Sequence, residues 1–163
     1  MLVVLGVDPG IRNTGWCILV DGKAKEHGVI RTQRQSWVEC IAIILRGLTK
    51  IIVDWHPDFA AVEHVAWYGR SRKITLPLSH IAGAITGSLL VNGIPTYCLI
   101  PSMKAKKKWP VKWSAHEVDA ANLALVAEQQ ESARSAGENS FLQRHLAVDK
   151  RKLSVVANVD GTG

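Results

Sequence analysis

Hydrophobic and polar positions follow a strand-like pattern over the first fifth of the chain. Residues 2–7 form a nearly continuous apolar run that ends in Asp8-Pro9-Gly10, as expected of a strand buried on both faces and followed by a turn. Residues 15–20 and 25–32 are further strand candidates, joined through Asp21-Gly22, a dipeptide typical of two-residue hairpins. This pattern predicts an antiparallel meander of three strands.

The rest of the chain alternates helical periods with short apolar runs. Apolar residues recur at spacings of three and four from Trp37 to Trp55, which predicts a helix over residues 36–55 with these tryptophans on its apolar side. Further helices are expected over residues 74–91 and 115–136, and short strands over residues 59–63 and 95–100. Ser114 and Glu117 have the spacing of a capping box at the start of the last helix.

This order of elements predicts an α/β protein with a mixed five-stranded sheet flanked by helices. We expect one domain over residues 1–137 and a polar, partly basic tail over residues 138–163, in which residues 141–153 are a further helix candidate. A length of 163 residues is enough for one hydrophobic core.

Composition excludes several classes of protein. The chain is 47% hydrophobic and 21% charged, which is typical of a folded globular protein. No apolar stretch reaches the roughly 18 residues that a membrane span needs, and the N-terminal run lacks the features of a signal peptide. Three widely spaced cysteines predict small apolar residues in a reducing compartment, not a disulfide framework or a zinc site. We therefore expect a cytoplasmic protein without a membrane partner.

Positive charge is concentrated in one internal segment. The chain carries 20 Lys and Arg against 14 Asp and Glu, a net charge of +6. No acidic residue lies between Glu63 and Glu117, whereas eight Lys and Arg do, so the remainder has 12 positive and 14 negative side chains. Such a segment indicates a polyanion partner, nucleic acid first of all, and a well-solvated face is the alternative.

Four polar residues lie where an α/β sheet would form a site. Asp8 and Glu63 end predicted strands, and His116 and Asp119 lie three residues apart on one side of the last helix. Carboxylates suit hard cations such as Mg²⁺, and two such ions support phosphodiester hydrolysis. Each residue also has a simpler interpretation, as a turn former, a solvated strand end or a polar helix start. Glu117 is assigned to capping.

Two further features allow more than one interpretation. Ser79, Gly83 and Gly87 lie four residues apart, which favours close approach of another helix, either within the fold or in a dimer. Trp109 and Trp113 lie among lysines and would either stack on unpaired bases or anchor the loop to the core.

Three segments resemble motifs of one enzyme family. The first segment is Leu5-Gly6-Val7-Asp8-Pro9-Gly10 with Asn13-Thr14-Gly15-Trp16, the second is Ala61-Val62-Glu63-His64-Val65, and the third runs from His116 to Ala124. Together they are similar to the motifs of RuvC-type Holliday junction resolvases of the ribonuclease H-like superfamily. The resemblance implies a ribonuclease H-like fold and a homodimer that nicks opposing strands of four-way DNA junctions symmetrically. It implies that Asp8, Glu63, His116 and Asp119 bind two Mg²⁺ or Mn²⁺ ions. It also places the dimer contact on the predicted helix over residues 74–91.

The sequence departs from the family pattern in two places. An aromatic residue usually follows the glutamate by three positions, but here that residue is Ala66, with Trp67 and Tyr68 next. The segment over residues 101–113 is shorter than in bacterial members, which would suit a compact phage version. The expected DNA-binding residues are Trp67, Tyr68, Arg70, Arg72, Lys73, Lys104, Lys106, Lys107, Lys108 and Lys112.

Three other functions remain as alternatives. The first motif also resembles the phosphate motif of actin-like ATPases and sugar kinases, but those need two such domains, for which 163 residues are too few. A related nuclease for flaps or RNA–DNA hybrids would share the same residues. A non-catalytic junction-binding module would have no need of all four ligands.

Overall fold

The computed structural model describes residues 1–33, 36–65, 72–99, 109–110 and 112–135. The chain divides into two units, Met1–Glu128 and Gln129–Gly163, and the first unit holds the sheet and nearly all of the packed core. The tail over residues 138–163, with its helix candidate, lies outside the described residues. No helix in the described part of the chain is long and apolar enough to cross a bilayer.

Five strands form one mixed sheet, as the sequence predicts. They are β1 (Val3–Asp8), β2 (Asn13–Val20), β3 (Lys23–Arg31), β4 (Phe59–Glu63) and β5 (Thr96–Leu99). Their order is β3-β2-β1-β4-β5, with antiparallel pairing among β1, β2 and β3 and parallel pairing of β4 with β1 and β5. The predicted hairpin at Asp21-Gly22 is confirmed, because both residues have the positive φ angles, 47° and 71°, that such turns require.

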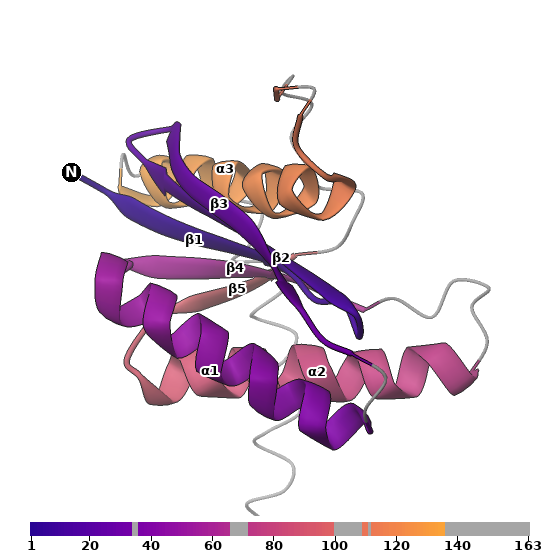
Figure 1. Cartoon of the computed structure of the whole chain (residues 1–163). Coiled ribbons are helices and arrows are strands. Elements are labelled where there is room, and N and C mark those ends of the chain that lie inside the picture. The colour runs from indigo at the N-terminus through magenta and orange to yellow at the C-terminus, as the bar shows by residue number, and fades with distance from the viewer. Residues whose placement is uncertain (34–35, 66–71, 100–108, 111, 136–163) are drawn as a thin grey trace, which may run out of the picture. The chain divides into compact units, whose positions relative to one another are not determined.

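Three helices cover the two sides of the sheet (Figure 1). Helices α1 (Trp37–Trp55) and α2 (Arg72–Val91) lie on one side, and α3 (Ala115–Ser135) lies on the other. Helix α1 begins at a Ser36–Glu39 capping box and ends at His56, whose φ of 44° is left-handed. The predicted helix boundaries therefore agree with the structure to within two residues.

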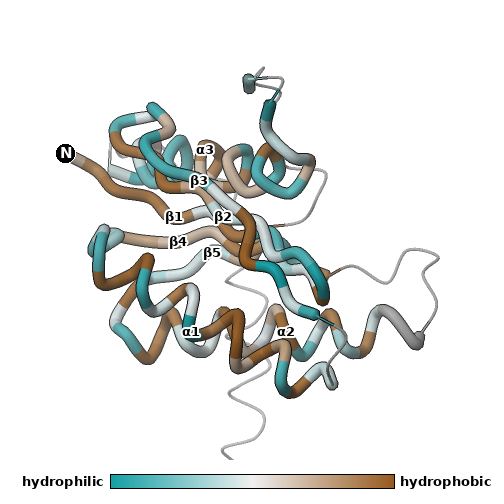
Figure 2. Tube along the Cα trace, in the orientation of Figure 1, coloured by the Kyte–Doolittle hydropathy of each residue, from teal (hydrophilic) through white to brown (hydrophobic). Residues whose placement is uncertain are grey.

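Alternation along the strands gives each side of the sheet its own hydrophobic cluster. Leu5, Val7 and Ile18 pack with the buried faces of α1 and α2. Val4, Cys17 and other residues pack with the alanine-rich face of α3. In Figure 2 the hydrophobic colour is strong at the start of β1 and alternates with polar colour along α1, as expected of a buried strand and an amphipathic helix.

Two side chains differ from expectation. Trp37 is 43% exposed and stacks on His80 of α2 with ring centroids 4.8 Å apart, so it does not belong to the buried side of α1. The reason is its position as the first residue of α1, where Cys40 instead begins the buried row. Cys98 is exposed, whereas Cys17 and Cys40 are buried as small apolar residues are.

Candidate functional site

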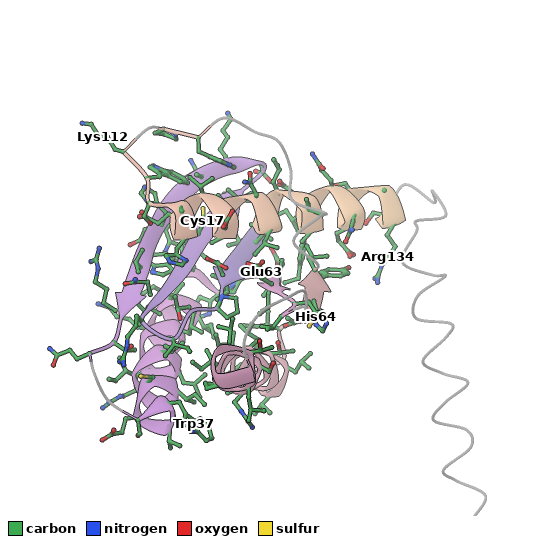
Figure 3. The ribbon with its side chains drawn as sticks, turned by 90° about the vertical axis from the view of Figure 1, so that its right-hand side faces the viewer. Cys17, Trp37, Glu63, His64, Lys112 and Arg134 are labelled. Atoms are coloured by element: carbon green, nitrogen blue, oxygen red, sulfur yellow. The ribbon has the colours of Figure 1, made fainter. Side chains whose placement is uncertain are left out.

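The first two predicted ligands end neighbouring parallel strands. The register between β1 and β4 pairs Val7 with Val62, and Asp8 and Glu63 are the next residues on their strands. Side chains alternate along a strand, so Asp8 and Glu63 lie on the α3 side of the sheet. Figure 3 shows Glu63 on the sheet beneath α3. The two carboxylates therefore come from adjacent strand ends on one face.

Helix α3 approaches this face closely enough to touch the strand backbones. A Cβ on Gly6 would lie 1.9 Å from the carbonyl oxygen of Ala120, and one on Gly15 would lie 2.2 Å from that of His116. Since Gly15 is paired with Asp8 in the sheet, this contact sets the start of α3 directly over the end of β1. Only glycine leaves room for such an approach.

The third predicted ligand meets the first across this contact. The Nδ1–H group of His116 donates a hydrogen bond of 2.6 Å to Oδ2 of Asp8, although the residues are 108 positions apart in sequence. The Asp8 side chain is 9% exposed and that of His116 is 41% exposed. The carboxylate is thus enclosed while the imidazole reaches solvent.

The fourth predicted ligand lies one helical turn further along α3. Asp119 is half-buried and follows His116 by three residues, so the two share one side of the helix. Among the described residues, no group of three or more His, Cys, Asp and Glu side chains lies close enough to share a metal ion. The structure therefore joins Asp8 and His116 directly and sets Glu63 and Asp119 on the same side without a tight cluster.

Glu117 closes a capping box with Ser114 at the start of α3, as the sequence predicts. It also has a second partner that the sequence did not reveal. Its Oε2 accepts hydrogen bonds from the backbone N–H (2.7 Å) and hydroxyl (2.6 Å) of Ser114. Its Oε1 accepts a bond of 2.7 Å from His27 Nδ1 on β3. Burial raises the pKa of Glu117, but the bonds from Ser114 and His27 outweigh it and leave that pKa below the ordinary value.

The thiol beneath this cap is inert. Burial, with a smaller contribution from the charge of Glu117, raises the pKa of Cys17 to about 12. The thiol therefore stays protonated at neutral pH and acts as a small apolar residue, as the composition suggests.

Both tryptophans before α3 anchor it to the fold. Trp113 stacks on His27 with centroids 3.8 Å apart, and Trp109 stacks on Trp113 at 5.2 Å. The indole Nε1–H of Trp109 donates a 2.7 Å hydrogen bond to Asn122 within α3. Both rings also pack against the α3-side cluster, so the anchoring interpretation is the one that the contacts favour.

Comparison with known proteins places the chain in a family. The family model described as crossover junction endodeoxyribonuclease RuvC matches residues 4–107, which include Asp8 and Glu63. The RuvC of Hahella chejuensis is 30% identical over 148 residues, covering 83% of this chain and 83% of that protein. The chain belongs to the RuvC family.

The match to other RuvC proteins is shorter. The RuvC of Chlorobaculum parvum is 30% identical over 99 residues, covering 58% of this chain and 52% of that protein. The chain spans about half the length of several curated relatives that it matches. The family model ends before His116, so the match in this model does not include α3.

Solved structures confirm the fold of the RuvC family. RuvC of T. thermophilus, solved in complex with Holliday junction substrate, matches with a TM-score of 0.70 at 21% identity, covering 85% of this chain and 98% of that chain. The yeast mitochondrial Holliday junction resolvase Ydc2 matches with a TM-score of 0.51 at 16% identity, covering 76% and 75%. The predicted ribonuclease H-like architecture is therefore confirmed.

Most of the predicted DNA-binding residues belong to the two basic loops between β4 and α2 and between β5 and α3. Trp67, Tyr68, Arg70 and the lysines at positions 104, 106, 107 and 108 lie outside the described residues. Arg72 and Lys73 begin α2, but their side chains are not described. Lys112 is exposed just before α3 and points away from the sheet in Figure 3.

Proposed function

We propose that this member of the RuvC family is a metal-dependent endonuclease that resolves four-way DNA junctions by paired, symmetric nicks. The observation that best supports this proposal is the enclosed carboxylate of Asp8, whose Oδ2 lies 2.6 Å from His116 Nδ1 at the end of β1. Glu63 on the adjacent strand and Asp119 one turn along α3 complete the set of donors on that face.

The donor types fit divalent metal ions. The RuvC family is metal-dependent, generally with Mg²⁺, and three carboxylates with one imidazole are ligands that Mg²⁺ or Mn²⁺ accepts. In our proposal Asp8, Glu63, His116 and Asp119 hold two Mg²⁺ ions. When bound, such a pair supplies charge stabilisation for both the attacking and the leaving oxygen of a phosphodiester.

The protein side chains have their own tasks. Enclosure of Asp8 beneath α3 keeps bulk water from competing for its carboxylate. With Nδ1–H held by Asp8, the Nε2 atom of His116 is the nitrogen left to bind an ion or to accept a proton from the attacking water. The half-exposed ring makes that nitrogen reachable from solvent.

We further propose that the protein acts as a homodimer through the outer face of α2. Gly83 and Gly87 are exposed there, and a Cβ on either would meet nothing within 4 Å among the described residues. Leu76 and Leu90 flank them and are 58% and 54% exposed. The small residues therefore serve no packing inside the described fold, which favours the dimer interpretation over the internal one.

The basic segment would hold the DNA backbone. We propose that Lys112, together with the loop lysines before it and the basic residues at the start of α2, neutralises phosphates of a branched DNA. This assignment predicts junction binding that weakens steeply as salt is raised. The nuclease domain in this proposal spans residues 1–137, and a cytoplasmic location stays a prediction.

One experiment tests the proposed activity. End-labelled four-way junction, linear duplex, flap and RNA–DNA hybrid are each incubated with the protein in Mg²⁺, in Mn²⁺ or in EDTA, and the nicks are mapped. We expect two symmetric nicks in the junction, dependent on the metal. Cleavage of the flap or hybrid alone would replace the substrate assignment, and metal-independent binding without cleavage would identify a junction-binding module.

The site assignment is tested by matched asparagine variants. We expect Asp8→Asn to abolish cleavage while junction binding and the melting temperature are retained, because the amide keeps the shape but loses the charge. Asp54→Asn makes the same change on the exposed surface of α1 and is expected to cleave at the wild-type rate. Full cleavage by Asp8→Asn would contradict the ligand assignment.

A further inference from the structure

The first turn of α3 carries more fixed contacts than helix capping needs. Asp8 of β1 bonds His116, the backbone of Gly15 on β2 lies against His116, and His27 of β3 bonds Glu117. Three neighbouring strands therefore hold two adjacent helical residues, with β1 and β2 against His116 and β3 against Glu117. Asp8, Gly15, His116 and Glu117 all belong to the sequence motifs described above, whereas His27 does not.

We propose that His27 is a positioning residue that holds the start of α3 so that the His116 imidazole stays against Asp8. This inference rests on the proposed function, in which His116 belongs to the site. It assigns a role to a strand residue that is 90 positions from its partner and outside every motif.

The carboxylate of Glu117 ties two separate segments together. One oxygen accepts from His27 at 2.7 Å, and the other accepts from the backbone and hydroxyl of Ser114 at 2.7 and 2.6 Å. An ionised carboxylate can accept hydrogen bonds but cannot donate them. The His27 Nδ1 atom therefore carries the proton in this pair. The cap of α3 is thereby attached to β3 as well as closed on itself.

The ring of His27 makes a second attachment to the same region. It stacks on Trp113, with centroids 3.8 Å apart and planes at 30°, directly before the cap residue. Trp113 in turn stacks on Trp109, whose indole donates to Asn122, two turns into α3. Both the cap and the segment that leads into it are therefore braced on the imidazole of His27.

The strand register explains why these contacts fix an orientation. His27 is paired with Cys17 on β2, two residues beyond Gly15, which lies under His116. The backbone contacts at Gly15 and Gly6 set the distance of α3 from the sheet, but they meet His116 and Ala120 along one line of the helix and so oppose a small roll about its axis only weakly. The Glu117–His27 bond acts one strand further out and restrains that roll. A roll of α3 would carry the His116 ring away from Asp8.

Two substitutions separate the hydrogen bond from the stacking. His27→Phe keeps an aromatic ring for Trp113 but has no donor for Glu117. His27→Asn keeps an N–H group near the Nδ1 position and loses the ring. Glu26→Gln, at the adjacent residue facing α1, where Glu26 accepts a bond from Trp55, serves as a control on the opposite face.

Two measurements test the role of His27. Single-turnover cleavage of saturating junction in Mg²⁺ is expected to fall about 10-fold or more in His27→Phe, with an unchanged junction dissociation constant and a larger Mg²⁺ requirement. His27→Asn is expected to restore most of the rate, and Glu26→Gln to keep it. Histidine ¹⁵N NMR of the EDTA-treated protein is expected to show one Nδ1-protonated His116 ring in wild type and an exchanging mixture of tautomers in His27→Phe.

The two readouts have separate consequences. A wild-type rate with unchanged His116 signals in His27→Phe would overturn the proposal, and so would an equal loss of rate in His27→Asn. If the wild-type protein cleaves no substrate, the proposed function fails, and the His116 signals alone then decide whether His27 positions that ring.

Discussion

The two sides of the sheet are built by opposite means. On the α3 side, Gly6 and Gly15 let the helix backbone rest on the strand backbone, with Ala120 and Ala124 against Gly6 and His116 against Gly15. On the other side, α1 and α2 are kept at a distance by large aliphatic side chains. These are Leu5, Ile18, Ile44, Leu48, Ile81 and Ile85.

This difference means that one side of the sheet positions the residues of the proposed site, while the other side mainly contributes to the stability of the fold. Contact between backbones cannot adjust by a change of rotamer, so it fixes how closely α3, with His116 and Asp119, lies against the sheet. Aliphatic side chains can repack, so the α1 and α2 side contributes buried area without fixing any group of the site. The proposed site therefore lies on the side with less adaptable packing.

The largest expected effect comes from adding one methyl group to the α3 side. Gly6→Ala places a Cβ 1.9 Å from the Ala120 carbonyl oxygen, and α3 has to move away from the sheet. We expect a loss of at least about 3 kcal/mol in the free energy of unfolding, measured by urea titration. Gly47→Ala on α1 is the matched control. Its Cβ would meet only the end of the Ile30 side chain, 2.8 Å from Cδ1, which can turn away, and we expect the free energy of unfolding to change by at most about 1 kcal/mol. Equal effects at both positions would contradict the comparison.

The next largest effect is expected from shortening a buried side chain on the α1 and α2 side of the sheet. Leu48 of α1 is buried in the larger cluster, and Leu48→Ala is expected to cost about 2–3 kcal/mol in urea unfolding. Because this side only supplies buried area, the cleavage rate per folded molecule is expected to stay at the wild-type value. A lower rate in the fully folded variant would show that α1 also positions the site.

A smaller effect distinguishes the two capping boxes. Ser36 and Glu39 cap α1 on an exposed surface, whereas Ser114 and Glu117 cap α3 where the carboxylate also bonds His27. We expect Ser114→Ala to cost about 1.5 kcal/mol and Ser36→Ala about 0.5 kcal/mol in thermal unfolding. Only Ser114→Ala is expected to slow cleavage. The reverse order of stabilities would refute the bracing of α3 by β3.

Local patterns predicted the elements and their pairing well. Asp21-Gly22 specifies its hairpin by backbone conformation alone, and Ser114 with Glu117 specifies a helix start within four residues. The ends of β1 and β4 placed Asp8 and Glu63 because parallel strands end at one edge. Such features depend on neighbours in sequence, or on one rule of topology, and so could be predicted from the sequence.

Contacts between distant segments could not be predicted in the same way. Nothing in the spacing of His27 shows that it meets Glu117, because that contact depends on how far α3 lies across β2 and β3. The exposure of Trp37 was missed for a related reason, since the period of α1 alone does not show where its packing begins. Strand ends, helix spacing and the resemblance to RuvC motifs together suggested the ligand set that we propose, and the sheet register places Asp8 and Glu63 on one face.

The smallest predicted effect is the pH dependence of the two caps. Hydrogen bonds from Ser36 lower the pKa of Glu39, and bonds from Ser114 and His27 outweigh burial to lower that of Glu117. Because each folded-state pKa lies below the unfolded value, each carboxylate stabilises the fold fully above the unfolded pKa, and that stabilisation is lost as pH falls through the folded one. Thermal unfolding in EDTA from about pH 6 to about pH 3 should therefore show the advantage of wild type over Glu117→Gln shrinking with acid. The same comparison for Glu39→Gln should give a smaller change, since Glu39 is exposed to solvent and its cap has no contact with the sheet among the bonds described.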